Sequence, residues 1–502
     1  MTSHLSPVPA TAPPQAPAGG AVSPRRAWLA LSVLLIGSTM SLLNSTIVNV
    51  ALPSIRTDLN TSDTALAWIV SGWALAFGLS LIPAGRLGDR IGHKWIFFTG
   101  VLVFTASSVA CGLAQSGTEL IIFRIIQGFA GGLFFPTVTV YIALLFNGRS
   151  KGTAFGVMGA VIGVASAIGP LVGGLLIQAA GSTDGWRLVF YINVPLGLVA
   201  LIATIFLIPN DIGDRATSRG LDLFGLLLLS VGLIGLLLPL IEGQSEGWPT
   251  WTLISAIGGA VVLAGFGAWE HRSDSRGGMA LVPPRLFRHP AFSAGSVLAL
   301  LFFAAFVSIF YVLALLWQLG LGYTALDTGL LSIPFALGSI LGAAVSGRLS
   351  HTLGRGVLLL GTAAVTIGLG WICADLALHT AEKVSAGELG VPLLLAGLGS
   401  GLFIAPNSQF IIATVSPAET GAASAVAATM QRLGTAIGLA MVATVFYSVL
   451  AAYQPLDQHA YTVSAATAIG VCAALAGISF LLVFALPRHI ASPDDRGSAS
   501  RR

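Results

Sequence analysis

The sequence predicts an all-α protein that crosses a membrane many times, with two six-helix halves and two further helices inserted between them. Three observations support this fold class: an apolar composition, fourteen apolar segments of spanning length, and a pattern that recurs in both halves. Hydrophobic residues fill 55% of the 502 positions and charged residues only 9%, against about 25% charged residues in soluble domains. This composition excludes a soluble globular enzyme and a disordered protein. The net charge of +4 is spread through loops, which excludes a nucleic-acid-binding face.

The N-terminal segment, residues 1–26, is rich in Pro, Ala and Ser, and we expect a disordered cytoplasmic tail there. The uncharged run that follows, residues 27–52, is too long for the apolar core of a signal peptide and has no small-residue cleavage pattern. We therefore interpret it as a first spanning helix that is retained. A second tail, residues 487–502, closes the chain.

Fourteen segments have the roughly 20 apolar residues that a bilayer-spanning helix needs. They are 27–52, 65–85, 95–115, 118–145, 153–178, 187–208, 221–241, 251–269, 291–316, 325–347, 356–376, 391–414, 420–449 and 461–486. The first six predict an N-terminal half at 27–208, the next two lie in an inserted region at 209–290, and the last six predict a C-terminal half at 291–486.

The positive charges orient these spans. With the N-terminus in the cytoplasm, nineteen of the 24 Lys and Arg residues lie on the cytoplasmic side, three lie outside and two fall within spans. Such an asymmetry is the positive-inside signal of membrane proteins. We therefore expect a multi-pass protein with both termini in the cytoplasm. The preference for Arg over Lys, with 61 Gly, is typical of a GC-rich bacterial genome and indicates a bacterial plasma membrane.

An internal repeat links the two halves. The segment Gly85–Gly92 after the second span and the segment Gly347–Gly354 after the tenth share Gly, Arg, Leu and a final Gly at the same spacing. Ala167-Ile168-Gly169 in the fifth span likewise matches Ala436-Ile437-Gly438 in the thirteenth. Duplicated helical halves are characteristic of secondary transporters, whose substrate path runs between the halves.

Five motifs in order resemble those of the fourteen-span drug:proton antiporters of the major facilitator superfamily. They are Leu43–Pro53, Gly85–Lys94, Arg124–Gly128, Gly169–Gly174 and Trp186–Gly197. The resemblance extends from about residue 27 to residue 486. It implies the major facilitator fold and a multidrug- or antibiotic-efflux type of transporter that works by alternating access.

In the loop after the second span, Gly85 and Gly92 permit a tight turn. Asp89 can accept hydrogen bonds from a helix N-terminus or pair with Arg86 or Arg90. The resemblance implies that Gly85, Asp89, Arg90 and Gly92 form a cytoplasmic latch that favours one conformation. A solvated charged turn is the alternative.

In the fifth span, Gly159, Gly163 and Ala167 recur every four residues, and such small-residue faces let helices approach closely. Pro170 should bend the helix, because it frees a backbone carbonyl. The resemblance implies an antiporter motif that acts as a bend and a dry seal, and ordinary small-residue packing is the alternative. The motif residues are Gly159, Gly163, Gly169, Pro170, Gly173 and Gly174.

Two arginines fall inside spans. Arg124 lies about 9 Å from the outer end of its span at 1.5 Å per residue. An arginine at the centre of a spanning helix costs about 2.5–3.5 kcal/mol on insertion scales. It should face a cavity or a partner, although snorkelling to the outer headgroups is the alternative. Gln127 shares its helix face. Arg432 lies about 18 Å deep, and we expect it to face the central cavity or an interhelical partner.

Asn44 departs from the family pattern. The resemblance places it where the family usually has an Asp that binds protons or contacts cationic substrates. Asn44 lies at about the depth of Arg124 and can accept its hydrogen bond, but an amide cannot titrate. No acid lies deep in the first six spans, so Asp375 is the candidate proton site, with an interfacial solvated acid as the alternative. Gln318 and Asn407 resemble polar pathway positions of the family.

The predicted function is a secondary transporter that exports small lipophilic compounds, such as drugs, antibiotics or related metabolites, by proton antiport. The alternative is an exporter of a specific neutral or anionic metabolite with altered or absent proton coupling, because Arg124 and Arg432 have no matching acid. Expected partners are a small lipophilic substrate, protons and lipid, with no nucleic acid, no ATP and no cofactor.

Other classes fit the sequence less well. The Gly169-Pro170 motif argues against an importer. An enzyme would need a nucleophile with a base, or convergent acids or histidines, and an ATP-driven pump would need a phosphate-binding loop; neither pattern occurs. Cys111, Cys373 and Cys472 lack metal-ligand spacing, so neither catalytic residues nor a metal site is expected. The duplicated halves favour alternating access over a channel.

Overall fold

The computed structural model describes residues 23–181, 184–210, 222–243, 246–276, 280–378, 386–413, 415, 419–453 and 456–487, and within these ranges every regular element is helical. Most of both predicted tails falls outside these residues. The first helix begins at Pro24, inside the predicted tail, because Ser23 caps it by accepting the backbone N–H of Arg26 and Pro24 suits the first turn.

The first half contains seven helices, because the sixth predicted span is broken. They are α1 Pro24–Asp58, α2 Asp63–Ile91, α3 His93–Leu113, α4 Gly117–Leu145, α5 Gly148–Ala180, α6 Gly185–Tyr191 and α7 Asn193–Leu207. The break falls at Ile192, three residues before Pro195, which has no N–H to continue the α6 ladder.

The inserted pair consists of α8 Leu223–Glu242 and α9 Thr250–Ser275. The second half follows it: η1 Pro284–Arg288, α10 Pro290–Leu315, η2 Leu316–Gly320, α11 Ala325–Leu331, α12 Ile333–Leu353, α13 Gly356–Leu378, α14 Ala386–Ala413, α15 Thr420–Leu450, α16 Gln458–Leu482 and η5 Val483–Ala485. The predicted span 325–347 is divided between α11 and α12 at Ser332, two residues before Pro334.

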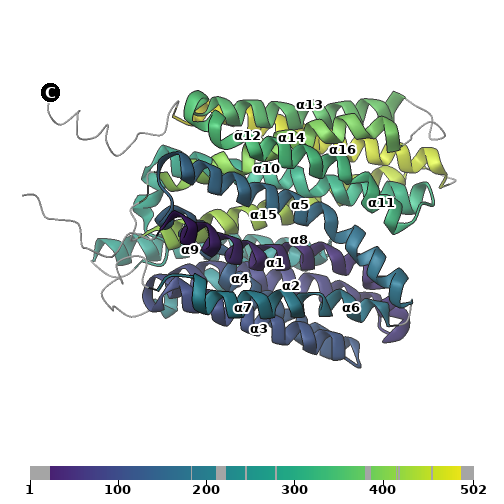
Figure 1. Ribbon diagram of the computed structural model, residues 1–502. Helices are drawn as coiled ribbons and strands as arrows, with labels where there is room; N and C mark the ends of the chain where they lie inside the picture. The colour runs from purple at the N-terminus through teal and green to yellow at the C-terminus, as the bar shows by residue number, and fades with distance from the viewer. Residues whose placement is uncertain are drawn as a thin grey trace, which may run out of the picture.

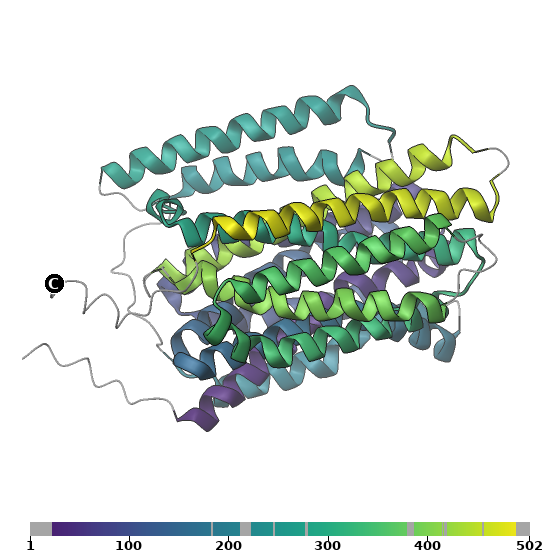
Figure 2. The same ribbon diagram turned by 90° about the horizontal axis from the view of Figure 1, so that it is seen from above.

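The two halves pack by one scheme (Figure 1). In the first, α1 packs on α5, α2 on α4, and α3 on both α4 and α7. In the second, α10 packs on α15, α12 on α14, and α13 on both α14 and α16. The sequence repeat is therefore matched by a repeat in helix packing. The inserted pair lies along the flank of the bundle (Figure 2), where α8 contacts α2 and α15.

Twelve of the described helices are long and apolar enough to cross a membrane, or thirteen when the bent α5 counts as one span. The remaining predicted span corresponds to α8, whose apolar stretch Phe224–Leu240 is shorter. The structure therefore supports a polytopic all-helical protein, and the predicted count of fourteen spans stays a prediction.

The halves meet through α2 on α15 and through α5 on α11, α12 and α14. We call the end of the bundle that holds Pro24, Ile91 and Thr420 the near end, and the end that holds Asp58, Gly117 and Leu450 the far end. Contacts between α2 and α15 join the halves at the near end, and the packing of Gly329 in α11 against Leu171 in α5 joins them at the far end.

Candidate transport site

Arg124 is the centre of a buried polar network inside the first half. Its side chain is 1% exposed. Nε donates to the Ile69 carbonyl of α2 at 3.0 Å, while Nη1 donates to Asn44 Oδ1 of α1 and, at 2.8 Å, to Gln127 Oε1. Gln127 in turn donates to the Ser108 hydroxyl of α3 at 2.7 Å. One guanidinium therefore ties together all four helices that begin the chain.

The partners of this guanidinium are neutral. Its carbon lies 5.2 Å from the ring centre of Trp73 and 5.9 Å from that of Phe190, so two aromatic faces add cation–π attraction. Near this guanidinium, two buried donors, Asn44 Nδ2 and Trp73 Nε1, have no hydrogen-bond partner among the described residues. The network therefore holds one uncompensated positive charge and two donors that its own residues leave unused.

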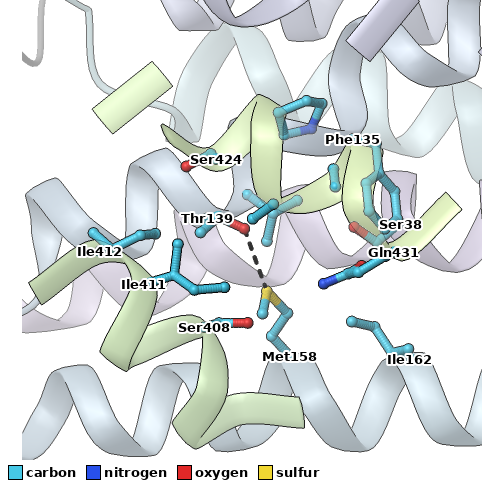
Figure 3. A pocket seen from close by; sticks show the side chains of 14 residues that line it. Ser38, Phe135, Thr139, Met158, Ile162, Ser408, Ile411, Ile412, Ser424 and Gln431 are labelled. Carbon is cyan, nitrogen blue, oxygen red and sulfur yellow. Dashed lines mark hydrogen bonds between the residues drawn. The ribbon is translucent and has the colours of Figure 1, made fainter. Parts of the chain in front are cut away.

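A cavity of about 30 Å³ lies between the halves (Figure 3). Side chains from α1, α4 and α5 form one wall, and side chains from α14 and α15 form the other. Thr139 Oγ1 contacts Met158 Sδ at 3.9 Å, and Gln431, Ser408 and Ser424 add polar groups, but no lining residue is charged. A cavity needs about 10–15 Å³ to hold a water, so this one is far too small for a drug-sized molecule.

Arg432 follows the lining residue Gln431 on α15. Its guanidinium carbon lies 4.1 Å from the ring centre of Phe77 and 5.5 Å from that of Phe135, which also lines the cavity. No carboxylate of the described chain pairs with Arg432. The structure therefore places Arg432 beside the cavity between the halves and Arg124 in a separate network within the first half.

The predicted latch lies at the near end. Gly85 packs directly on α15, where an added Cβ would lie 2.6 Å from the Gly421 carbonyl oxygen. The Asp89 carboxylate lies beside Gly421 in the first turn of α15. Asp89 Oδ1 also lies within hydrogen-bond distance of His93 Nε2, at 3.1 Å. A carboxylate at a helix N-terminus is favoured by the helix dipole. These contacts join the two halves at this end.

The other two latch residues have different positions. Arg90 is exposed. Gly92 connects α2 to α3 with φ +99°, and its counterpart in the repeat, Gly354, connects α12 to α13 with φ +52°. Only glycine adopts such backbone angles readily. The shared final glycine of the repeat therefore serves the same sharp connection in both halves.

The glycines of the predicted antiporter motif lie on two faces of α5. Gly159 packs against Ala405 of α14, and Gly163 packs so closely on Ser339 of α12 that a Cβ there would collide with the hydroxyl. Both residues therefore belong to the contact between the halves.

Two of the later motif glycines face the first half instead: Gly169 packs on Thr46 of α1, and Gly173 packs on Ile47. Gly174 faces the second half, where an added Cβ would be in van der Waals contact with Leu326 of α11. Between these groups α5 bends by 44°, at the break between Ser150–Ala165 and Ile168–Ala180. Pro170 lies just beyond this bend, where its missing N–H interrupts the helix ladder.

Three predicted pathway residues lie away from both sites. Gln318 is exposed in η2, and Asp375 is half-buried near the last turn of α13. Asn407 is buried in α14, where Nδ2 donates to the Gly295 carbonyl at 3.0 Å and Oδ1 has no partner among the described residues. Asn407 precedes the cavity-lining Ser408, but it does not line the cavity itself.

Several contributors had no signal in the sequence. Ser108 and the Ile69 carbonyl complete the Arg124 network, but a serine or a carbonyl in an apolar helix looks like any other. At the far end, Asp58 accepts from Trp186 Nε1 at 2.9 Å and from Arg187 Nη2 at 3.1 Å. The residues that the structure describes contain no cluster of potential metal ligands.

Comparison with known proteins identifies the family. Residues 34–439 match the Major Facilitator Superfamily. The chain belongs to this superfamily. Among curated relatives, the probable actinorhodin transporter of Streptomyces coelicolor is 35% identical over 453 residues, which cover 88% of this chain and 78% of the relative. The tetracenomycin C resistance and export protein of Streptomyces glaucescens is 32% identical, with 84% of this chain and 76% of the relative covered.

A third relative, the puromycin resistance protein of Streptomyces alboniger, is 32% identical over 493 residues. The match covers 95% of this chain and 94% of the relative. Solved structures show the same fold. The proton:xylose symporter XylE superposes with a TM-score of 0.65 at 15% identity, covering 95% and 99% of the two chains. The human organic anion transporter MFSD10 superposes with a TM-score of 0.62 at 16% identity, covering 92% and 100%.

Proposed function

We propose that this protein is a secondary transporter that exports antibiotic-like, small lipophilic compounds across a bacterial plasma membrane. The observation that carries the proposal is the cavity between two packed halves, with a buried arginine network on one side and Arg432 beside it. The relatives described as antibiotic transport, export and resistance proteins support this assignment of substrate class.

We propose that the protein works by alternating access. Because the cavity holds only about 30 Å³ and the two halves contact each other near both ends of the bundle, we infer an occluded conformation between an inward-open and an outward-open state. The latch at Gly85 and Asp89 would separate to open the near end, and the α5 contacts with α11 and α12 would separate to open the far end.

The charge of the site favours neutral or anionic substrates. Arg124 and Arg432 lie within the helix bundle without carboxylate partners in the described chain, and Asn44 supplies an amide where the family resemblance leads one to expect a carboxylate. A lipophilic cation would be repelled by the buried charge of Arg124 and the half-buried charge of Arg432, because charges are weakly screened in a low-dielectric interior. We therefore propose a specific neutral or anionic metabolite as the second candidate substrate class.

Proton coupling needs a titratable group other than residue 44. Among the residues that the structure describes, only two carboxylates are buried, Glu242 at 4% and Glu270 at 2% exposure, and both belong to the inserted pair. Glu242 Oε1 accepts a hydrogen bond from the Ser71 hydroxyl of α2 at 2.8 Å. Ser71 lies two residues after Ile69, whose carbonyl accepts from Arg124. We propose proton antiport with Glu242 as a second candidate proton site beside Asp375.

The topology belongs to the same proposal. We propose fourteen spans, with α8 as the shortest, and a cytoplasmic near end. The support is the concentration of Lys and Arg in segments that connect helices at that end, as the positive-inside rule requires.

The experiment uses inside-out vesicles with an acidic lumen and a luminal pH dye. Cationic, neutral and anionic lipophilic compounds are added outside, and proton release is followed. We expect release with neutral or anionic compounds. Release with cations only would contradict the charge argument, and substrate uptake without any proton release would contradict antiport.

Substitutions then assign the proton site. Glu242→Gln and Asp375→Asn are compared with Glu246→Gln, which changes an exposed acid in the α8–α9 connection. We expect one of the first two to abolish proton release while substrate still equilibrates down its gradient. Normal coupling in both would place the proton site elsewhere.

A further inference from the structure

Residues 280–283 of the connection from α9 to α10 are buried. Ala280, Leu281, Val282 and Leu286 are all buried, whereas connections between helices usually run exposed over the surface. A buried backbone needs hydrogen-bond partners. The partners of this segment come from two helices on either side of it.

Arg86 of α2 binds two backbone carbonyls of this segment. Its Nε donates to the Leu281 carbonyl at 2.6 Å, and its Nη2 donates to the Ala280 carbonyl. Arg348, which has the same place in the second copy of the repeat, is exposed to solvent. The contact of Arg86 is therefore not a shared feature of the repeat but a feature of the half that meets the inserted pair.

Glu270 of α9 binds a backbone N–H of the same segment. Its Oε2 accepts the Val282 N–H at 2.9 Å, while Oε1 has no hydrogen-bond partner among the described residues. Hydrogen bonds to charged groups are stronger than neutral ones. Two ionisable side chains from different helices thus hold three consecutive residues of the connection.

The same connection continues to the second half. Arg285 in η1 pairs with Glu419 at 2.5 Å, and Glu419 is the N-cap residue of α15. Gly421, two residues further, is the position on which Gly85 and Asp89 pack. The connection therefore contacts both helices of the latch, α2 through Arg86 and α15 through Glu419.

We propose that residues 280–288 form a strap that ties the inserted helices to the near-end latch, with Arg86 and Glu270 as its positioning residues. The strap holds α2 and α15 together in the occluded state and must release one of them before the near end opens. The role of the strap in transport rests on the proposed function, but the contact that the strap makes can be tested without a substrate.

The test measures opening at the near end directly. Ser424→Cys places a thiol on the cavity wall in the second turn of α15. The full-length protein in lipid nanodiscs is treated with a maleimide, and the labelling rate is followed without substrate. The parent protein without Ser424→Cys gives the background from the native cysteines, two of which are buried. Leu378→Cys, an exposed site, reports general thiol reactivity.

We expect Arg86→Ala and Glu270→Ala each to raise the labelling rate of Cys at 424 about tenfold, as the loss of a charged hydrogen bond predicts. Glu270→Gln keeps an acceptor for the Val282 N–H and should stay closer to the parent. Arg348→Ala is the matched control and should leave the rate unchanged. An equal rise with Arg348→Ala would overturn the proposal, since it would indicate general loosening of the near end.

A second set of variants avoids buried positions. Arg285 is 60% exposed, so Arg285→Glu should fold. Arg285→Glu or Glu419→Arg alone should raise the labelling rate, and the double reversal should lower it again. Parental rates in both single variants would overturn the proposal. Raised rates in a protein that exports none of the test compounds would retain the strap and refute the proposed function instead.

Discussion

At the scale of single residues, Arg124 is fixed by acceptors on three sides. Its rigid fork reaches the Ile69 carbonyl with Nε while Nη1 reaches Asn44 and Gln127. A lysine presents a compact charge on a flexible stem and cannot satisfy this planar arrangement. The geometry of the guanidinium therefore matters here, and not only its charge.

Arg124→Lys should reduce the initial rate of export at least tenfold while the protein still reaches the membrane, since the positive charge is retained. The loss has the size expected when a charged hydrogen bond is lost, about 1.5–3 kcal/mol. Rates in vesicles are normalised to protein amount, and Arg348→Lys at an exposed site is the control. A parental rate in Arg124→Lys would show that the network has no part in transport.

Asn44→Asp should restore a titratable pair with Arg124. The new carboxylate would be ionised beside the guanidinium and would neutralise the site, so lipophilic cations should become substrates. Export should also gain a further pH dependence, in addition to that of the parent's proton antiport, because protonation of the new Asp breaks the pair. Substrate range and pH profile are measured in the same vesicles; if neither changes, the charge argument is wrong.

The sequence was sufficient for some of these contacts. Helix depth alone predicted that Asn44 and Arg124 lie at one level, and the structure brings them together. Ser108 and the Ile69 carbonyl were not predictable, because a backbone acceptor has no sequence signature and serines are common in apolar helices. Gln318 resembled a family position, but its side chain is exposed.

At the scale of an element, α5 contacts both halves. Its glycine spacing predicted a smooth face, but spacing cannot say which neighbour fills it. Gly163 meets Ser339 of the second half, whereas Gly169 meets Thr46 of the first. The change of partner coincides with the 44° bend before Pro170, which the sequence did predict from the proline.

Gly163→Ala should weaken the contact between α5 and α12, because its Cβ would collide with the Ser339 side chain. Export should fall severalfold. Ser339→Gly removes the colliding atoms, so the double variant should regain most of the export rate, as coupled neighbours do in a double-mutant cycle. Equal loss in the single and double variants would mean that the collision is not the cause.

At the scale of the whole molecule, the duplicated halves were predictable, because the repeated motifs and the long apolar segments can be read directly from the sequence. The role of the inserted pair was not. Connections are normally exposed, so nothing in the sequence indicated that residues 280–283 are buried and held by Arg86 and Glu270. The predicted span 221–241 corresponds closely to α8, Leu223–Glu242, although the apolar stretch Phe224–Leu240 is shorter than the other candidate spans.

Cysteine labelling from each side of the membrane tests the topology. Glu246→Cys, between α8 and α9, and Leu378→Cys should react with an impermeant maleimide in intact cells. Arg272→Cys and Arg348→Cys should react only in inside-out vesicles. All four positions are exposed. Labelling of the Glu246→Cys variant only from inside would mean that α8 and α9 do not cross the membrane.

The packing of α8 on α2 also bears on how such a chain gains or loses helices. If residues 211–289 were removed and the two halves joined directly, Arg86 would lose the carbonyls that it binds and Ser71 would lose Glu242. The exposed flank of α2 would then present to lipid a surface shaped for a protein neighbour. The inserted pair is therefore not a detachable module, and among related chains the residues at positions 71 and 86 should change together with the presence of the pair.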